Sequence, residues 1–151
     1  LLGNNNTTTS GDDFTGNANT AYYMCPAAAA SATVATAYFY DNIGMETDPV
    51  HVCIWNSSGT LLGCSGNITM GASTGWRSVS WSGPALTEST TYCIGIVSGT
   101  TTGFWTRHDT SSPAIPACAA DDSGQTFGTE GDVPTTTCER TEGSFAIYVT
   151  N

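Results

Sequence analysis

The stretch "HVCIWNSSGTLLGC", residues 51–64, decides the fold. Two apolar runs flank a Ser-Ser-Gly sequence, which is the pattern of a β-hairpin. A two-residue turn at Ser58-Gly59 pairs Trp55 with Leu62 and Cys53 with Cys64. Residues that face each other in this way lie about 5.5 Å apart at Cα, which a disulfide can span. The stretch therefore predicts a Cys53–Cys64 disulfide, and a slightly longer loop would suit that bond better.

A metal site is the alternative interpretation of the same stretch. His51, Cys53 and Cys64 could bind a metal ion if a fourth ligand converged on them, but the tight ligand spacing of structural zinc sites is missing. The hairpin disulfide is favoured, and closing so short a loop is expected to stabilise the fold by about 2 to 3 kcal/mol.

The other four cysteines suggest two more disulfides. Cys118 and Cys138 could close a long acidic segment, which leaves Cys25 with Cys93 to join an early strand to a later one. Only the pairs that are close in sequence have an argument of their own, so other pairings stay open.

The composition favours an exported protein of one domain. Six cysteines, no lysine and a formal charge of −10 are typical of an oxidising compartment, so we expect an extracellular or cell-surface location. Arg77, Arg107 and Arg140 are the only fixed positive charges, which excludes nucleic acid and acidic membranes as partners. No run reaches the roughly 18 apolar residues of a membrane span. The first residues lack a starting Met and a basic signal region, so a processed chain or a fragment is expected.

The fold class follows from the spacing of apolar residues. Short β-branched and aromatic segments alternate with Gly, Pro, Ser and Thr, and no three-four helical spacing is sustained, which predicts an all-β protein. Alternate residues of 145–149 and of 92–96 are apolar, and these two faces should meet inside a single antiparallel β-sandwich. Strands are expected within residues 21–25, 32–41, 50–55, 60–64, 76–82, 91–98, 103–108 and 144–150.

Two segments differ from the sandwich pattern. Residues 1–16 are polar and rich in Thr and Asn, and we expect a flexible or subunit-docking arm whose Leu1 and Leu2 anchor assembly. The sandwich domain then spans residues 17–151. Within it, residues 108–142 form a long insertion that holds seven of the thirteen acidic residues.

No catalytic residue is predicted. The segment "GASTG", residues 71–75, matches a nucleophile-elbow pattern, but that elbow joins a strand to a helix and Ser73 lies between two expected strands. No cofactor is required. Calcium is the candidate ion, because carboxylates gather in two expected loops. The proposed ligands are Asp41, Glu46 and Asp48 in one loop and Asp121 and Asp122 in the other.

Sugars could be attached to the protein or bound by it. Four asparagines begin N-x-S/T sequences and are candidate glycosylation sites: Asn5, Asn6, Asn56 and Asn67. Trp55 and Trp81 are expected in the core. Trp105, next to the acidic insertion, is the candidate for stacking on a glycan.

Two longer stretches carry a family resemblance. They are "AYFYDNIGMETDPVHVCIWNSSGTLLGCS", residues 37–65, and "GWRSVSWSGPALTESTTYCIGIVSG", residues 75–99. Their order of parts, an SSGTLL hairpin, a GW-x-x-V strand and a P-x-L-T-x-x-T-T-Y turn, resembles jelly-roll modules of exported bacterial surface, fibre and adhesin proteins. The cysteines, the acidic insertion and the Thr/Asn arm depart from that pattern, and no binding residue can be transferred.

Two functions are compatible with the sequence. The first is a non-catalytic extracellular structural protein, a subunit of a fibre or adhesive appendage that self-associates through residues 1–16. The alternative is a carbohydrate-binding module of a secreted or surface protein. The first is favoured because it gives the arm a role.

Overall fold

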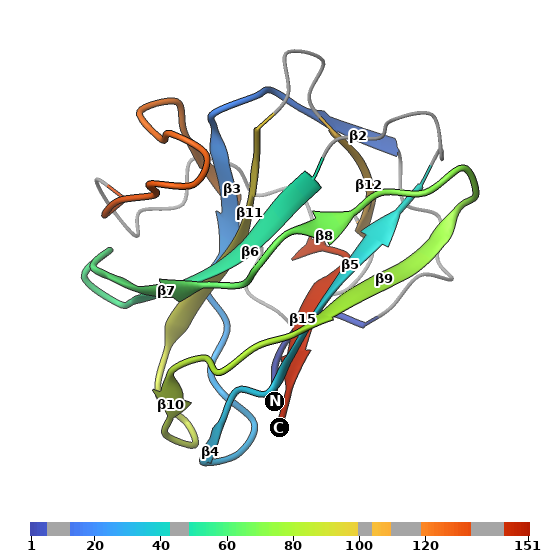
Figure 1. Cartoon of the computed structure of the whole chain (residues 1–151). Coiled ribbons are helices and arrows are strands. Elements are labelled where there is room, and N and C mark those ends of the chain that lie inside the picture. Colours follow the sequence, from blue (N-terminus) through green and yellow to red (C-terminus); the bar gives the residue numbers. More distant parts are fainter. Residues whose placement is uncertain (6–12, 43–48, 100–103, 110–118, 134–143) are drawn as a thin grey trace.

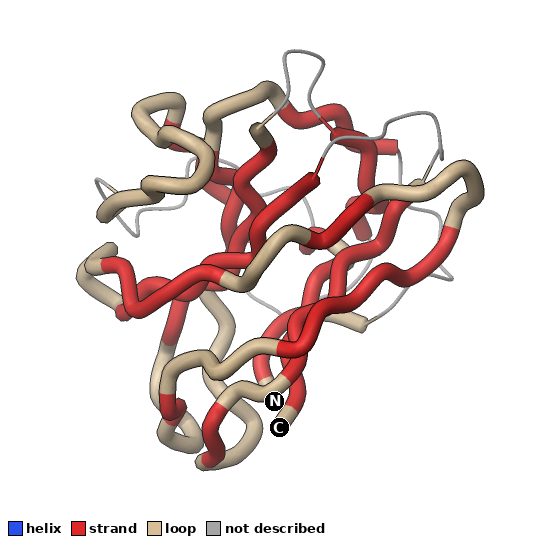
Figure 2. The backbone as a smooth tube through the Cα atoms, viewed as in Figure 1, coloured by secondary structure: helices blue, strands red, loops and turns tan. Residues whose placement is uncertain are grey.

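The computed structural model describes residues 1–5, 13–42, 49–99, 104–109, 119–133 and 144–151 (Figure 1). Within these ranges the chain contains strands and no helix, and the strands pair antiparallel, as the sequence predicts. Figure 2 shows the strands in red, joined by tan loops. No helix that is long and apolar enough to cross a membrane occurs in this part of the chain.

Two larger sheets form the body of the molecule. The first has the order β1-β15-β5-β9, with strands at Leu2–Gly3, Ile147–Thr150, Thr36–Asp41 and Gly75–Ser80. The second has the order β13-β3-β11-β6-β7, with strands at Ala119–Asp122, Ala21–Met24, Tyr92–Ser98, Pro49–Asn56 and Leu61–Cys64. Strand β8, Ile68–Thr69, also pairs with β6.

Two smaller sheets complete the fold. Strand β10, Ala85–Leu86, pairs with β4, Ala32–Thr33. Strand β12, Phe104–Asp109, lies between β14, Ser144–Phe145, and β2, Asp13–Gly16.

The main core lies between the two larger sheets. Phe39 of β5 and Ile147 of β15 share one buried cluster with Ile54 of β6 and Ile94 of β11, and all four are 0% exposed. The apolar alternations at 92–96 and 145–149 both belong to this cluster, so the predicted meeting of the two faces is confirmed. A side-chain period of two explains the result, because alternate residues of a strand point to the same face.

The hairpin of β6 and β7 has the predicted cysteine pair and a different turn. Cys53 faces Cys64, and the two form a disulfide with 4.0 Å between their Cα atoms. Trp55 pairs with Leu61 and not with Leu62, because a β-bulge shifts the register next to Trp55. Gly59 adopts a φ of +86° in the longer loop, a conformation that favours glycine. The bulge leaves Leu62 outside the pairing and 40% exposed.

The second disulfide joins Cys25, next to β3, to Cys93 of β11, which is the pair that elimination left. Cys118 and Cys138 lie outside the described residues. Both observed disulfides lie at the second sheet. Cys53–Cys64 joins β6 to β7, and Cys25–Cys93 joins the residue after β3 to β11.

Residues 1–16 differ from the predicted arm at both ends. Leu2 lies in β1, faces Val149 of β15 and is only 3% exposed. Asp13–Gly16 form β2 and pair with β12. The edge of β15 offers unpaired backbone groups, and an apolar Leu2 gains free energy by filling the adjoining core, so the segment folds onto its own chain. Residues 6–12 are outside the described ranges.

Candidate functional site

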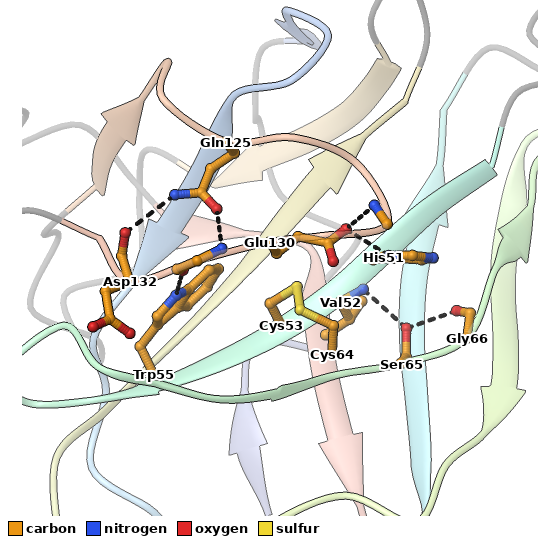
Figure 3. The surroundings of a disulfide bond; sticks show 12 residues. His51, Val52, Cys53, Trp55, Cys64, Ser65, Gly66, Gln125, Glu130 and Asp132 are labelled. Carbon is orange, nitrogen blue, oxygen red and sulfur yellow. Dashed lines mark hydrogen bonds and ion pairs between the residues drawn. A yellow bond between two sulfur atoms is a disulfide. The ribbon is translucent and has the colours of Figure 1, made fainter.

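A segment from the acidic insertion, residues 123–133, covers the outer face of the second sheet, and we call it the covering segment. It is attached to the β6–β7 hairpin by three hydrogen bonds. Figure 3 shows Gln125, Glu130 and Asp132 of this segment beside the Cys53–Cys64 disulfide. Trp55 Nε1 donates to the Gly131 carbonyl at 2.9 Å, and the Leu61 amide donates to Asp132 Oδ1 at 2.8 Å. The third runs from the Val133 amide to the Gly59 carbonyl at 2.9 Å. Part of the insertion is therefore a structural cover and not a free loop.

His51 is bound by groups on both sides of its ring. Nδ1 lies 2.7 Å from Glu130 Oε1 in the covering segment, and Nε2 lies 2.7 Å from Asn67 Oδ1. The ring also stacks on Phe127, with 4.1 Å between ring centroids. The side chains of His51 and Glu130 are 11% and 6% exposed, so this contact is largely shielded from water.

A metal ion does not fit this site. Cys53, Cys64 and Glu130 form the one group within the described ranges whose ligand atoms are spaced closely enough for a metal. The two sulfur atoms are bonded to each other, so no thiolate remains to bind an ion. Both ring nitrogens of His51 already have partners. The preference for a disulfide over a metal site is therefore confirmed at this hairpin.

Asp41, a predicted calcium ligand, is neutralised by an arginine. It is 3% exposed, and its Oδ2 accepts hydrogen bonds from Arg77 Nε at 3.2 Å and from the Gly71 amide at 2.9 Å. Arg77 also donates through Nη2 to the Ser73 carbonyl. The structure gives Asp41 a role in holding the loop before β9, because a buried carboxylate needs a counter-charge and hydrogen-bond donors. Ser73 lies in this loop, with no helix after it.

The other predicted site residues are placed as follows. Glu46, Asp48 and Asn6, and the side chains of Asp121, Asp122 and Trp105, lie outside the described residues. Asn5 and Asn67 are exposed, and Asn56 is partly buried. Asn56 Oδ1 accepts hydrogen bonds from the Ser58 and Thr60 amides, so this asparagine also stabilises the hairpin turn.

Four aromatic side chains gather on the outer face of the first sheet, and the sequence did not predict them as a group. We call Tyr38, Tyr40, Trp76 and Tyr148 the aromatic face. Tyr38 and Tyr148 stack in parallel with ring centroids 4.4 Å apart, and Trp76 meets Tyr148 edge-on at 4.9 Å. Trp76 also meets Tyr40 edge-on at 5.3 Å. The available signal was the alternation in 36–41, where tyrosines occupy the positions that point away from the core.

Tyr148 stays uncharged over the physiological range. Partial burial, and then the neighbouring Tyr38, raise the pKa of the Tyr148 phenol above its ordinary value of 10.0. Its hydroxyl can therefore both donate and accept a hydrogen bond.

A pocket of about 250 Å³ adjoins this face at the edge of the first sheet. Its lining comes from the first residues of the chain, from the segment after β3 and from β15: Leu1, Leu2, Gly3, Asn5, Ala27, Ala29 and Tyr148. The Ala29 amide donates to the Leu1 carbonyl at 2.9 Å and fixes one wall. Tyr148 belongs to both the pocket and the aromatic face.

Replacing Glu130 by alanine is expected to lower the free energy of unfolding by about 1 to 3 kcal/mol, because His51 Nδ1 would lose its acceptor in a largely buried position. Chemical denaturation of both proteins measures the difference. Glu88→Ala, which removes an exposed carboxylate, is the control and should change stability by less than about 0.5 kcal/mol. Equal effects of the two substitutions would contradict a structural role for Glu130.

Three comparisons place the chain among known proteins. Neither the curated proteins nor the solved structures give a match. A family model matches residues 26–145, which include β4 to β14. The matched part holds two of the four strands of the first sheet, β5 and β9, and every described strand of the second sheet except β3. The matched part excludes β1 and β15 of the first sheet, and it excludes Cys25, one half of a disulfide. The chain belongs to the family described as Domain of unknown function (DUF4082).

Proposed function

We propose that the protein is a non-catalytic extracellular structural subunit that assembles into a fibre or surface appendage by exchanging β1 between neighbouring copies. The burial of Leu2, at 3% exposure, carries the proposal. Leu2 lies on a two-residue strand at the edge of a sheet, so a very short segment supplies a core residue. A copy that lacked this segment would have an open groove beside β15, which a second copy could fill.

The contacts of β1 are all of a kind that a second copy could supply. Leu2 and Gly3 pair with Val149 and Tyr148, and the Asn4 amide donates to the Ile147 carbonyl at 2.6 Å. Exchange between identical chains keeps each of these contacts, which is why such swapping costs little. The contacts would then join subunits by strand addition, in which backbone hydrogen bonds give affinity and a buried side chain gives register.

Gly3 makes the pairing of β1 specific. Its φ is +102°, and a Cβ at this position would lie 2.7 Å from the Tyr148 Cα and closer still to the Ile147 carbonyl oxygen. Only glycine therefore allows β1 to approach β15 this closely. The segment is fitted to this one edge, which supports a dedicated docking role.

Three further properties suit a durable extracellular subunit. Two disulfides persist only in an oxidising environment and restrict unfolding. A lysine-free chain with a formal charge of −10 discourages non-specific association. The hairpin and turn motifs resemble those of exported bacterial surface modules, which is the basis for proposing a bacterial fibre.

A cysteine pair distinguishes exchange from folding within one chain. With Leu2→Cys and Val149→Cys combined, facing residues are close enough for a disulfide. Assembled material should then give a ladder of covalent multimers on a non-reducing denaturing gel, and Leu2→Cys alone should give no such ladder. A product that is cross-linked only within single chains would exclude exchange of β1.

A second pair of variants tests the assembly itself. Leu2→Asp puts a charge into the core groove and should prevent fibres, as seen by electron microscopy and sedimentation. Leu62→Asp places the same charge on an exposed leucine and should leave assembly unchanged. Fibres formed by Leu2→Asp would contradict the proposal.

A carbohydrate-binding role is the second candidate. The sequence-based hypothesis used Trp105, whose side chain is outside the described residues. The aromatic face is a different observation that favours the same class of ligand.

A further inference from the structure

The outward residues of the first sheet are aromatic or bear hydroxyl groups, and none is charged. Along β5, β9 and β15 they are Thr36, Tyr38, Tyr40, Trp76, Ser78, Ser80, Tyr148 and Thr150. The chain as a whole has a formal charge of −10, so this face differs from the rest of the molecule. The main core lies on the other side of these strands and does not include these residues.

The four aromatic rings hold one another in place. Tyr38 stacks in parallel on Tyr148, and Trp76 packs edge-on against Tyr148 with an angle of 84° between the two ring planes. Tyr40 packs edge-on against Trp76, with an angle of 78° between the two ring planes. Rings that are ordered before binding lose little conformational entropy when a ligand arrives, so the face is preorganised.

The pocket extends this surface beyond the sheet edge. Tyr148 lines the pocket of about 250 Å³ and also stacks in the aromatic face, so one ligand could contact both. The pocket is small and partly apolar, and Asn5 supplies it with an amide. A ligand that spans both parts has to be elongated, with repeating units that each bear an apolar face and polar edges.

A neutral polysaccharide has this chemistry. The faces of pyranose rings carry C–H groups that pack on the negative faces of aromatic rings, and their edges carry hydroxyls that pair with Ser, Thr and Tyr hydroxyls. Anionic glycans are disfavoured because the chain is acidic and the outward residues of β5, β9 and β15 include no fixed positive charge. A protein partner is the competing occupant, because tyrosine and tryptophan are enriched in protein–protein interfaces. Serine is depleted there, and Ser78 and Ser80 belong to this surface, which favours the polysaccharide.

We propose that the aromatic face and the adjoining pocket bind a neutral polysaccharide chain. Tyr148 belongs to both the aromatic face and the pocket, and Trp76 packs edge-on against it. The aromatic face is built on β5, β9 and β15, whereas β1 and the residues beside it line much of the pocket. The pocket therefore forms wherever a β1 is paired with β15, whether that β1 belongs to the same copy or to a neighbour.

Affinity electrophoresis of the full chain tests the proposal. Native gels that contain hydroxyethyl cellulose, mannan, xylan or soluble starch should slow the protein in at least one case, and gels that contain carboxymethyl cellulose or alginate should not. Tyr148→Ala and Trp76→Ala should each weaken the binding by about tenfold, the equivalent of one aromatic contact. Tyr148→Phe keeps the ring and should retain most of the affinity. Leu62→Ala, on the other sheet, is the control and should bind as the parent protein does.

Circular dichroism of each variant separates lost binding from lost folding. No retardation in any neutral gel would overturn the proposal, and so would full retardation of Tyr148→Ala. If Tyr148→Ala dissolves assemblies of the protein while the parent binds no polysaccharide, the face is an interface between copies and the proposal is wrong. The cross-linking result for Leu2 and Val149 is independent of all these outcomes.

Discussion

Removing the Cys25–Cys93 disulfide is expected to lower the free energy of unfolding by about 4 kcal/mol, and removing Cys53–Cys64 by about 3 kcal/mol. The two bonds close loops with sequence separations of 68 and 11 residues. A longer loop loses more conformational freedom in the unfolded chain when it is closed, so the bond between distant residues stabilises more. Few small domains tolerate a loss of this size, because their total stability is about 5 to 15 kcal/mol.

The measurement is chemical denaturation at 25 °C of two double variants, Cys25→Ala with Cys93→Ala and Cys53→Ala with Cys64→Ala. Each replaces both cysteines of one bond, so the substitution itself leaves no unpaired thiol that could exchange with the other described disulfide. Cys53 and Cys93 are both 0% exposed, so each variant also creates a buried space of similar size. That cost should cancel in the comparison. A larger loss for the short loop would show that the chain-entropy argument does not govern these bonds.

Replacing Trp55 by alanine is expected to cost about 3 to 5 kcal/mol, the range for deleting a large aromatic side chain from a core. Trp55 is 0% exposed, packs on Tyr23 with 5.7 Å between ring centroids, and donates to the Gly131 carbonyl. The substitution therefore opens a cavity and detaches one of the points that hold the covering segment. Amide hydrogen exchange in residues 123–133 should accelerate more than exchange in β5, which lies in the other sheet.

Trp55→Phe separates the two contributions. Phenylalanine keeps most of the packing against Tyr23 and loses the indole N–H, so the expected loss is nearer to about 1 to 2 kcal/mol. Leu62→Ala, at an exposed position on the same hairpin, should stay within about 0.5 kcal/mol of the parent. If Trp55→Ala leaves exchange in the covering segment unchanged, the hydrogen bond to Gly131 does not hold that segment.

Local pattern was a good guide wherever a strand is paired with its neighbour in sequence or has one face in the core. The alternations at 92–96 and 145–149 predicted which residues are buried, and the spacing of Cys53 and Cys64 predicted their disulfide. The bulge that pairs Trp55 with Leu61 was not predicted. A loop one residue longer, followed by a one-residue bulge, leaves Cys53 opposite Cys64, so the cysteine spacing does not reveal the bulge.

Contacts between distant segments could not be predicted from local pattern. Leu2 was assigned to a docking arm, since a short apolar pair in a polar segment gives no indication of which edge it meets. The structure pairs it with Val149, at the other end of the chain. Asp41 was assigned to calcium, and its partner is Arg77, which lies beside it only because β5 and β9 are adjacent.

The sequence by itself determined that the chain is all-β, that its strands have a buried and an outward face, and that Cys53 lies opposite Cys64. These follow from the period of two along a strand and from turn residues a few positions away. The tertiary structure decided that residues 123–133 cover the second sheet, that β1 fills the edge of the first, and that four aromatic residues from three strands form one face. Each of these depends on which strands become neighbours, and that choice depends on the free energy of the whole packed core, which no single stretch of sequence contains.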